Sequence, residues 1–409
     1  MPSEEPLLKG KTVAVIGFNA RPLACSARRA GAEVIVSDYW GDEDLADCSS
    51  QWKAVLAPER GQRQRRSLEE PPHETLARNL LESIQGRQVD FVFVGSGFDD
   101  NTNSLRLLER EVPITGNSSD LMSKSRDFEA LSRLAHELNL GFPIRLTAKS
   151  VAEALDLCEE IGYPCVIRPP RSGGGRGITL VSNPVQAESV SWKLEFDETV
   201  EEIVVQEYIQ GIDASCSVLS TGDGAKAVSV QGQLIGIPSS GRHNDFVYSG
   251  NYIPFEVTGV AKNKIERASE QICESFKLVG SNGVDFVVDN NGSVWLLEVN
   301  PRFQGTLEML EHSGNVSMTE LHASACLGDL PSQVPTFVPA VRLVVFARRT
   351  GLTPDLSSYP SAVDRTPKGV LVKRGDPVCS LVLRGESLAS CYLEAMSVAT
   401  SIQNGVTPP

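Results

Sequence analysis

The chain has 409 residues, too many for one ordinary hydrophobic core, and a globular composition with 41% hydrophobic and 22% charged residues. A net charge of −14 argues against a general nucleic-acid binder, because neutralising a phosphate backbone requires a basic surface. No apolar run approaches the ~20 residues that cross a bilayer, and the acidic start lacks a signal-peptide core, so we expect a cytoplasmic protein without a membrane partner. The nine cysteines include no Cys-x-x-Cys pair, and we expect them to be reduced, small buried residues.

The first part of the chain alternates strand and helix patterns. "TVAVIG", "EVIVSDY" and "DFVFV" indicate buried strands, "PLACSARRAG" indicates a helix, and "VPITGN" indicates a further short strand. This alternation predicts a doubly wound parallel sheet of Rossmann type over 1–116. Ligands of such sheets lie beyond the carboxyl ends of the strands. The residues expected there are Asn19, Arg21, Ser96 and Asp99.

A glycine-rich loop dominates the next part. One continuous helix is predicted over 119–140, and Pro143 ends the pattern. A second helix and a strand ending in Arg168 lead into the loop. Consecutive glycines let backbone N–H groups approach phosphate oxygens, and arginines add charge, so the loop predicts a phosphate site rather than a simple hairpin. Its members are Arg171, Gly173, Gly174, Gly175, Arg176 and Gly177.

Two later strands carry the most specific pattern. "GVDFVV" and "LLEVNPR" flank a hairpin turn in "NNGS", so Asp285 and Glu298 are close to opposite. Asn300 shares their face, because it lies two residues beyond Glu298. Two carboxylates and an amide oxygen suit Mg²⁺, and Arg302 would then reach a phosphate. The alternative interpretation is a pair of solvated strand residues. Beyond this hairpin, "VRLVVFA", "GVLVKRGDPVCSLVLRG" and a short helix indicate a small β-rich cap.

Taken together, "GYPCVIRPPRSGGGRGI", "VVQEYIQG", "GVDFVV" and "LLEVNPR" resemble the ATP-grasp superfamily. The start of the chain and "FVYSGNYIPF" are similar to archaeal-type ATP-dependent carboxylate–amine ligases related to biotin carboxylase. The resemblance implies a mixed α/β and α+β fold, the ATP-grasp fold, in four parts. These are a Rossmann-like pre-ATP-grasp domain at 1–116, a glycine-loop subdomain at 117–205, a metal-site subdomain at 206–337 and a C-terminal β-rich cap at 338–409.

The resemblance also implies roles for individual residues, with ATP and Mg²⁺ as cofactors and Mn²⁺ as a substitute. The metal ligands would be Asp285, Glu298 and Asn300. The residues in contact with the reacting phosphate would be Arg302, Asn300 and Arg168. The nucleotide would contact Lys124, Arg168, Arg171, Gly173, Gly174, Gly175, Gln206, Glu207, Tyr208, Ile209 and Asp213.

Two positions depart from the ATP-grasp pattern. A lysine usually stands where this sequence has Arg168, and an Asp-Lys step usually stands where it has Asp127 and Phe128. The cations nearest to that step are Lys124 and Arg126. Arginine keeps the charge of a lysine but not its geometry.

The sequence therefore predicts an ATP-dependent ligase that activates a small carboxylate as an acyl phosphate for attack by an amine, with a homodimer as the default assembly. One alternative is a bicarbonate-activating carboxylase, although the chain lacks a Met-Lys-Met biotinyl segment. Another is a non-catalytic nucleotide-binding regulator, suggested by the two missing lysines. Candidate substrate anchors are Arg21, Arg242 and Asn251, and His243 is either a base or a solvent-facing loop residue.

Overall fold

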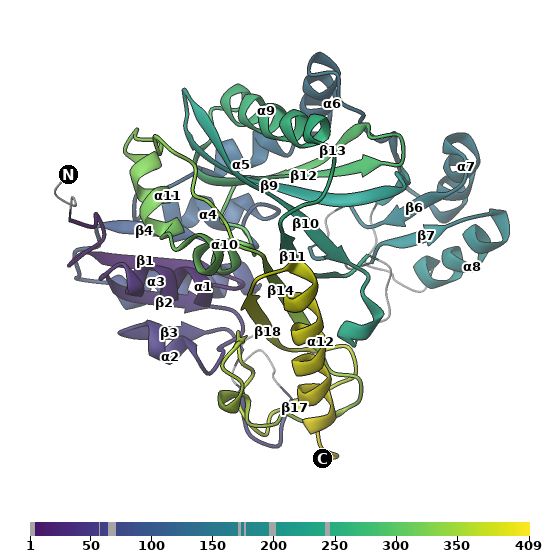
Figure 1. Cartoon of the computed structure of the whole chain (residues 1–409). Helices are drawn as coiled ribbons and strands as arrows, with labels where there is room; N and C mark the ends of the chain where they lie inside the picture. Colours follow the sequence, from purple (N-terminus) through teal and green to yellow (C-terminus); the bar gives the residue numbers. More distant parts are fainter. Residues whose placement is uncertain are drawn as a thin grey trace.

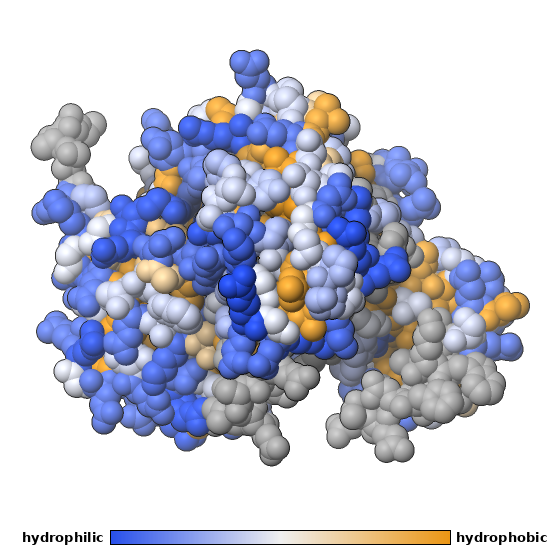
Figure 2. Space-filling view, turned by 90° about the horizontal axis from the view of Figure 1, so that it is seen from below, coloured by the Kyte–Doolittle hydropathy of each residue, from blue (hydrophilic) through white to orange (hydrophobic). Residues whose placement is uncertain are grey.

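The computed structural model describes residues 5–56, 58–63, 71–170, 173–175, 177–195, 202–241 and 246–409, without the side chains of 190–195 and 239. Figure 1 shows a parallel sheet near the N-terminus, a large central sheet, and a small sheet with its own helices on the opposite side. The face in Figure 2 is mostly hydrophilic, with apolar residues in separate patches. Within the described ranges, no helix is both long enough and apolar enough for a membrane span.

The N-terminal sheet has the strand order β3-β2-β1-β4 and is parallel throughout. This confirms the predicted parallel sheet, but one expected strand is wrong. Residues 112–117 form no strand, because Pro113 has no N–H for a ladder, although Thr115 still donates its backbone N–H to Val92 at 2.9 Å. The elements are β1 (Thr12–Gly17), α1 (Arg21–Arg29), β2 (Glu33–Asp38), α2 (Leu45–Cys48), β3 (Gln51–Ala54), α3 (Pro72–Ile84), β4 (Phe91–Val94) and α4 (Thr102–Glu109).

The single helix predicted over 119–140 is instead two helices, α5 (Ser119–Ser125) and α6 (Phe128–Glu137). Asp127 causes the break, because it leaves the helical conformation and its side chain accepts a 2.8 Å hydrogen bond from the backbone N–H of Ala130. An aspartate is a favoured N-cap and a poor residue for the interior of a helix. The break leaves Arg126 in the link between the two helices.

A small antiparallel sheet, β5-β8-β6-β7, forms the lobe at the right of Figure 1. Its inner face packs against α7 through a cluster of buried small and aliphatic side chains. The opposite face carries Arg168, at the end of β6. The elements are β5 (Arg145–Ala148), α7 (Val151–Ile161), β6 (Cys165–Arg168), β7 (Thr179–Val181), α8 (Pro184–Glu195) and β8 (Ile203–Glu207).

The large sheet has eight strands in the order β13-β12-β9-β10-β11-β14-β18-β16. Helix α9 covers one face, where Ile265 and Ile272 pack with Val284, Phe286 and Val299. The C-terminal strands continue this same sheet, and the 18-residue helix α12 packs on them. The elements are β9 (Gly211–Thr221), β10 (Ala225–Ile235), η1 (Pro238–Ser240), β11 (Tyr248–Ile253), α9 (Gly259–Ser275), β12 (Val279–Asp289), β13 (Val294–Asn300), α10 (Leu307–Gly314), α11 (Met318–Cys326), β14 (Ala340–Phe346), β15 (Gly351–Leu352), η2 (Leu356–Ser358), β16 (Ala362–Val363), β17 (Leu371–Val372), β18 (Pro377–Arg384) and α12 (Leu388–Gly405).

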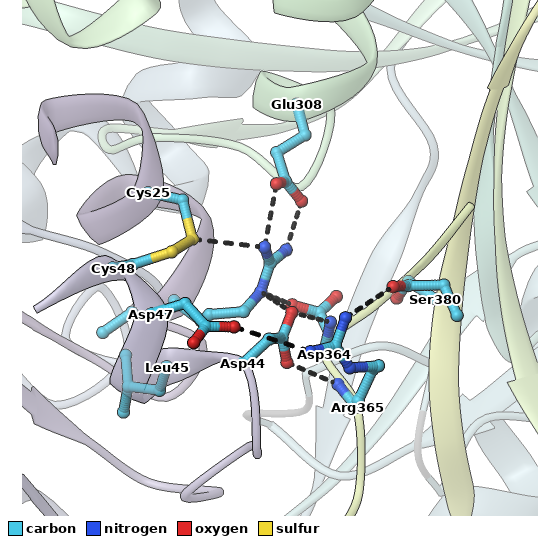
Figure 3. Close-up of polar contacts among 12 residues, drawn as sticks. Cys25, Asp44, Leu45, Asp47, Cys48, Glu308, Asp364, Arg365 and Ser380 are labelled. Carbon is cyan, nitrogen blue, oxygen red and sulfur yellow. Dashed lines mark hydrogen bonds and ion pairs between the residues drawn. A yellow bond between two sulfur atoms is a disulfide. The ribbon is translucent and has the colours of Figure 1, made fainter. Parts of the chain in front are cut away.

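A buried network of ion pairs joins the N-terminal sheet to the rest of the chain (Figure 3). Arg21, at the start of α1, is 2% exposed and donates both terminal nitrogens to the carboxylate of Glu308. Its Nε donates to Asp364 at 2.7 Å, and Asp44 lies 3.5 Å away. Burying a guanidinium is tolerable only with such partners. Arg21, expected as a substrate anchor, is thus engaged by three carboxylates of the protein.

Cys25 and Cys48 form a disulfide that links α1 to α2, with their Cα atoms 4.6 Å apart (Figure 3). The expectation that all nine cysteines are reduced is therefore wrong for this pair. The other seven cysteines are free, and six of them are buried, as expected. A spacing of 23 residues gave no sign of the pairing, because only the packing of α1 against α2 brings the two thiols together.

Candidate active site

The hairpin of β12 and β13 brings the three predicted metal ligands together. Asp285 pairs directly with Glu298, and Asn300 pairs with Gly283. The register shifts between Asp285 and Phe286, because Leu297 is an extra residue in β13. Without this bulge, Glu298 would lie opposite Val284 and point into the core beneath α9. The bulge therefore places Glu298 on the same face as Asp285.

The side chains of these three residues touch one another. The amide nitrogen of Asn300 donates to Asp285 Oδ2 at 2.9 Å and to Glu298 Oε1 at 3.3 Å. The Oδ1 atom of Asp285 is buried and lies outside hydrogen-bonding geometry with any described donor. Burial, followed by repulsion from Glu298, raises the pKa of Asp285 to about 7. A cation would relieve both penalties, because it would supply the missing partner and the missing positive charge.

This donor set fits a hard divalent cation such as Mg²⁺. Two carboxylates and an amide suit such an ion when water and nucleotide phosphates complete its coordination. Turning the amide of Asn300 would offer its oxygen as a third ligand. In the described part of the chain, no group of three or more His, Cys, Asp or Glu side chains is arranged to hold a metal by itself.

Arg302 is fixed beside the hairpin by a residue from the N-terminal sheet. Its Nε donates to Asp99 Oδ2 at 2.9 Å, and its Nη2 donates to the amide oxygen of Asn300 at 3.1 Å. Burial alone would raise the pKa of Asp99, but the charges of Arg302 and Arg126 outweigh burial and lower it. Asp99 is therefore a carboxylate at neutral pH and holds the Arg302 guanidinium in one orientation.

Arg126 also reaches the hairpin, from the break between α5 and α6. It donates to the backbone carbonyl of Val299 at 3.1 Å and to Asp100 at 2.8 Å, and it lies 3.7 Å from Glu298. Burial acts to lower the pKa of this guanidinium. The surrounding carboxylates raise it by more, so the pKa is above its ordinary value and the charge is retained. Lys124 is exposed, and no hydrogen bond or ion pair joins its side chain to another described residue. The structure thus brings Arg126 rather than Lys124 to the site.

Arg168 ends β6 and is half-buried, and its Nε is buried without a hydrogen-bond partner among the described residues. Burial lowers its pKa and outweighs the carboxylate of Glu298, which acts in the opposite direction, as does Asp100, whereas the charge of Arg126 lowers it further. An unpaired buried guanidinium nitrogen is costly and suits an anionic ligand. Arg171 and Arg176, which the sequence placed in the following loop, lie outside the described residues.

The glycine-rich loop lies against the start of β11. The carbonyl of Gly174 accepts a hydrogen bond from the backbone N–H of Tyr248 at 3.3 Å. A Cβ at Gly175 would lie only 1.7 Å from the carbonyl oxygen of Phe246, so this close approach requires glycine. A Cβ at Gly173 or Gly174 would meet no atom of a described residue within 4 Å.

The other predicted nucleotide contacts lie along β8 and the start of β9. Gln206 and Glu207 end β8, and Glu207 accepts a hydrogen bond from the backbone N–H of Ile144 at 3.1 Å. Tyr208 follows, with its ring 6.0 Å from that of Phe246. Ile209 is half-buried in the link to β9. Asp213 lies on the same face of the sheet as Asp285, and burial raises its pKa to about 6.

Sequence analysis missed a polar band across the large sheet. Asp285 pairs with Ser215, and Ser215 pairs with Gln231, so these side chains share one face of successive strands. The band continues through Gln233, Asn251 and Arg342, whose pairings follow the same row. The alternation of polar residues in "ASCSVLS" and "VSVQGQLI" was the available signal. Asn251 thus lies in the band, whereas Arg242 and His243 are outside the described residues.

Known sequences are similar to the middle of the chain and, in one case, to most of it. Residues 128–306 match the sequence model of the ATP-grasp domain. The carbamoyl phosphate synthase large chain of Ralstonia nicotianae is 28% identical over 233 residues, which are 55% of this chain but only 21% of that protein. An uncharacterized protein of Methanocaldococcus jannaschii is 24% identical over 379 residues, which are 90% of this chain and 87% of that protein.

Solved structures share the overall fold. Biotin carboxylase of Campylobacter jejuni, solved with β,γ-ATP, has a TM-score of 0.74 at 16% identity and covers 97% of this chain and 92% of its own. The biotin carboxylase domain of 2-oxoglutarate carboxylase from Hydrogenobacter thermophilus has a TM-score of 0.72 at 13% identity and covers 96% and 89%. That domain was solved as a dimer with MgADP, ADP and bicarbonate. Residues 128–306 therefore match an ATP-grasp domain, and the chain has the fold of biotin carboxylase.

Proposed function

We propose that the protein uses Mg-ATP to activate a small carboxylate as an acyl phosphate, which an amine then attacks to give an amide, ADP and phosphate. One observation carries this proposal. Asp285, Glu298 and Asn300 meet on one face of the large sheet beside Arg302, which Asp99 holds in place. A pair of carboxylates next to fixed cations suits the binding of a metal-complexed phosphate chain.

The first step transfers the γ-phosphoryl group. A carboxylate oxygen of the substrate forms a bond to the γ-phosphorus, the bond from that phosphorus to the β–γ bridging oxygen breaks, and ADP leaves. Bound Mg²⁺ would neutralise part of the phosphate charge. Arg302 would orient the carboxylate, and Arg126 and Arg168 would stabilise the negative charge of the phosphates. Catalysis of this kind depends on positioning and electrostatics and needs no protein nucleophile.

The second step needs a place for the amine. The polar band leads away from Asp285 through Gln231, Gln233 and Asn251, and it offers hydrogen-bonding groups beside the metal ligands. The amine nitrogen attacks the carbonyl carbon of the acyl phosphate, phosphate leaves with its bonding electron pair, and the amine loses a proton. We expect the acceptor to lie along this band.

Bicarbonate is the second candidate for the activated acid. The fold likeness to biotin carboxylase, and the bicarbonate bound to the H. thermophilus domain, favour it. The same groups would then form carboxyphosphate. A non-catalytic regulator was suggested by two missing lysines, but Arg126 and Arg168 supply positive charge near the hairpin.

The dimer of the H. thermophilus domain supports the expectation of a homodimer.

The test is phosphate release from Mg-ATP with a panel of carboxylates and amines, and with bicarbonate alone. We expect release only when an acid and an amine are both present. Release with bicarbonate and no other acid would identify a carboxylase instead. Tight ATP binding with no release across the panel would contradict both activities and favour a regulator. Asp223→Asn is a matched control for variants of the site, because Asp223 is an exposed aspartate whose one ion pair among the described residues is with Lys277.

A further inference from the structure

Arg145 was not singled out by the sequence, yet it lies on the same sheet face as Arg168. Strand β8 pairs with β5 on one side and with β6 on the other. Arg145 lies opposite Gln206, and Arg168 lies opposite Val204. Gln206 and Val204 are two residues apart on one strand, so their partners point to the same side. Two arginines from neighbouring segments thus face the space above β8.

Neither arginine forms an ion pair with a described carboxylate, although Glu298 and Asp100 act on the pKa of Arg168 from a distance. Among the described residues, no ion pair or hydrogen bond engages the side chain of Arg145 or Arg168, and the Nε of Arg168 is buried. Burial, followed by the charges of Arg168 and Arg126, lowers the pKa of Arg145 to about 10. Only Glu202 acts in the opposite direction on Arg145. Gathering like charges in a half-buried place is unfavourable unless an anion binds between them.

Phe128 orients the Arg145 side chain. The guanidinium carbon of Arg145 lies 5.1 Å from the centroid of the Phe128 ring, a cation–π contact. Phe128 occupies the position at which ATP-grasp enzymes usually carry a lysine. The chain lacks the lysine charge at position 128, but the guanidinium of Arg145, from β5, lies over the Phe128 ring.

We propose that Arg145 binds the phosphates of the nucleotide together with Arg168, with Phe128 as the platform that orients its guanidinium. This inference rests on the proposed function, because it assumes that Mg-ATP is the ligand. It assigns a phosphate contact to a residue of β5 and explains how the chain keeps a cation without the Asp-Lys step.

A purely structural role predicts a different outcome. If Arg145 only holds α6 on β5 through the cation–π contact, then removing it lowers the melting temperature of the unliganded protein. If Arg145 is a phosphate ligand, then removing one of several like charges leaves that temperature unchanged or raises it. Only the stabilisation by Mg-ATP would then be lost.

The experiment compares wild type, Arg145→Gln, Arg145→Lys and the control Arg133→Gln in the full chain. Arg133 is an exposed arginine of α6. Calorimetric titration measures the affinities for Mg-ATP, Mg-ADP and adenosine, and thermal unfolding measures stability without ligand. We expect Arg145→Gln to lower the affinities for Mg-ATP and Mg-ADP at least about tenfold, because charge-assisted hydrogen bonds to the phosphates would be lost. The affinity for adenosine should not change. Arg145→Lys should recover part of the loss, and Arg133→Gln should match wild type.

Two results would overturn the proposal. One is an unchanged affinity for Mg-ATP in Arg145→Gln, which would leave the proposed function standing. The other is an equal loss for adenosine together with a lower melting temperature, which would show a structural role. If wild type binds no nucleotide, the proposed function fails, and pyrophosphate becomes the probe. Pyrophosphate binding that Arg145→Gln abolishes would still support a phosphate contact, whereas no binding to wild type would overturn it.

Discussion

Asp99 accepts a 2.9 Å hydrogen bond from Nε of Arg302, although 203 residues separate the two in the chain. This contact ties the loop after β4 of the N-terminal parallel sheet to the end of β13, which carries the proposed metal ligands Glu298 and Asn300. Asp99 is 7% exposed, and Arg302 and Arg126 keep its pKa below the usual range, so it is charged when the site works. Asp99 is therefore a positioning residue, and Arg302 is the group that would contact the substrate.

We predict that Asp99→Asn lowers kcat about 10–100-fold, because it loosens Arg302. The KM for ATP should change little, because Arg126 remains held by Asp100 at 2.8 Å and by the carbonyl of Val299 at 3.1 Å. The measurement is steady-state phosphate release with the acid and amine found in the panel. The control is Asp120→Asn, an exposed partner of Arg106 whose loss should have no effect. Equal kcat in Asp99→Asn and wild type would refute the positioning role.

Arg126 and Lys124 give a matched pair of cations from one short segment. We predict that Arg126→Gln weakens Mg-ATP binding about tenfold or more, because its guanidinium lies beside Glu298 and Asp100, whereas Lys124→Gln binds like wild type. Calorimetric titration of both variants with Mg-ATP measures the difference. The reverse order of effects would show that the exposed lysine is the phosphate ligand.

The raised pKa of Asp285 predicts that both the stability of the fold and its affinity for Mg²⁺ depend on pH. Without a cation, the folded pKa of about 7 lies above the ordinary value of 3.8, so the folded state holds a proton that the unfolded chain releases. The contribution of this group to stability is therefore fully present below about pH 4 and is lost as the pH rises through 7. Metal binding needs the carboxylate, so Mg²⁺ affinity should fall as the pH drops below 7.

Two measurements check this dependence. Titration of Mg²⁺ in the presence of ADP at pH 6, 7 and 8 should give increasing affinity. Thermal unfolding without metal at pH 8 should show Asp285→Asn more stable than wild type by roughly 2–4 °C, because the buried charge is gone. An affinity for Mg²⁺ that does not change between pH 6 and 8 would speak against a raised pKa at this carboxyl.

The disulfide between Cys25 and Cys48 predicts that the oxidised, denatured chain accepts seven alkyl groups and the reduced chain nine, which intact mass measures directly. Closing a loop of 23 residues stabilises the fold by about 3 kcal/mol, so reduction should lower the melting temperature. Cys326→Ser, which removes a free half-buried thiol, should not alter this shift. Nine alkyl groups on protein that was never reduced would refute the pairing.

Some of this architecture could be predicted from sequence because it depends on local periodicity. Alternating strand residues and the "NNGS" turn predicted the hairpin and placed Asp285 and Glu298 close to opposite, but a regular ladder on this turn would have put Glu298 on the other face. The bulge at Leu297 that completes the alignment left no mark in the pattern. The break at Asp127 was not predicted, because the residues around it fit one continuous amphipathic helix. Only the role of Asp127 as the N-cap of α6 separates the two helices.

Other features depend on which distant faces pack together, and periodicity carries no such information. The pairs Asp99 with Arg302 and Arg21 with Glu308 join segments more than 200 residues apart. Arg145 belonged to no motif in the sequence, because its meaning comes from Phe128 and Arg168 in the fold. The cysteine pair was missed for the same reason.

The most direct test of the metal-dependent nucleotide site is thermal unfolding with ATP, with and without Mg²⁺, for wild type, Asp285→Asn and Glu298→Gln. We predict that Mg-ATP stabilises wild type and that ATP with EDTA does so much less. Both variants should keep the unliganded fold and lose the Mg²⁺-dependent part of the stabilisation, together with phosphate release. The control Asp223→Asn should behave like wild type. Full Mg²⁺-dependent stabilisation and turnover in Asp285→Asn and Glu298→Gln would contradict the site.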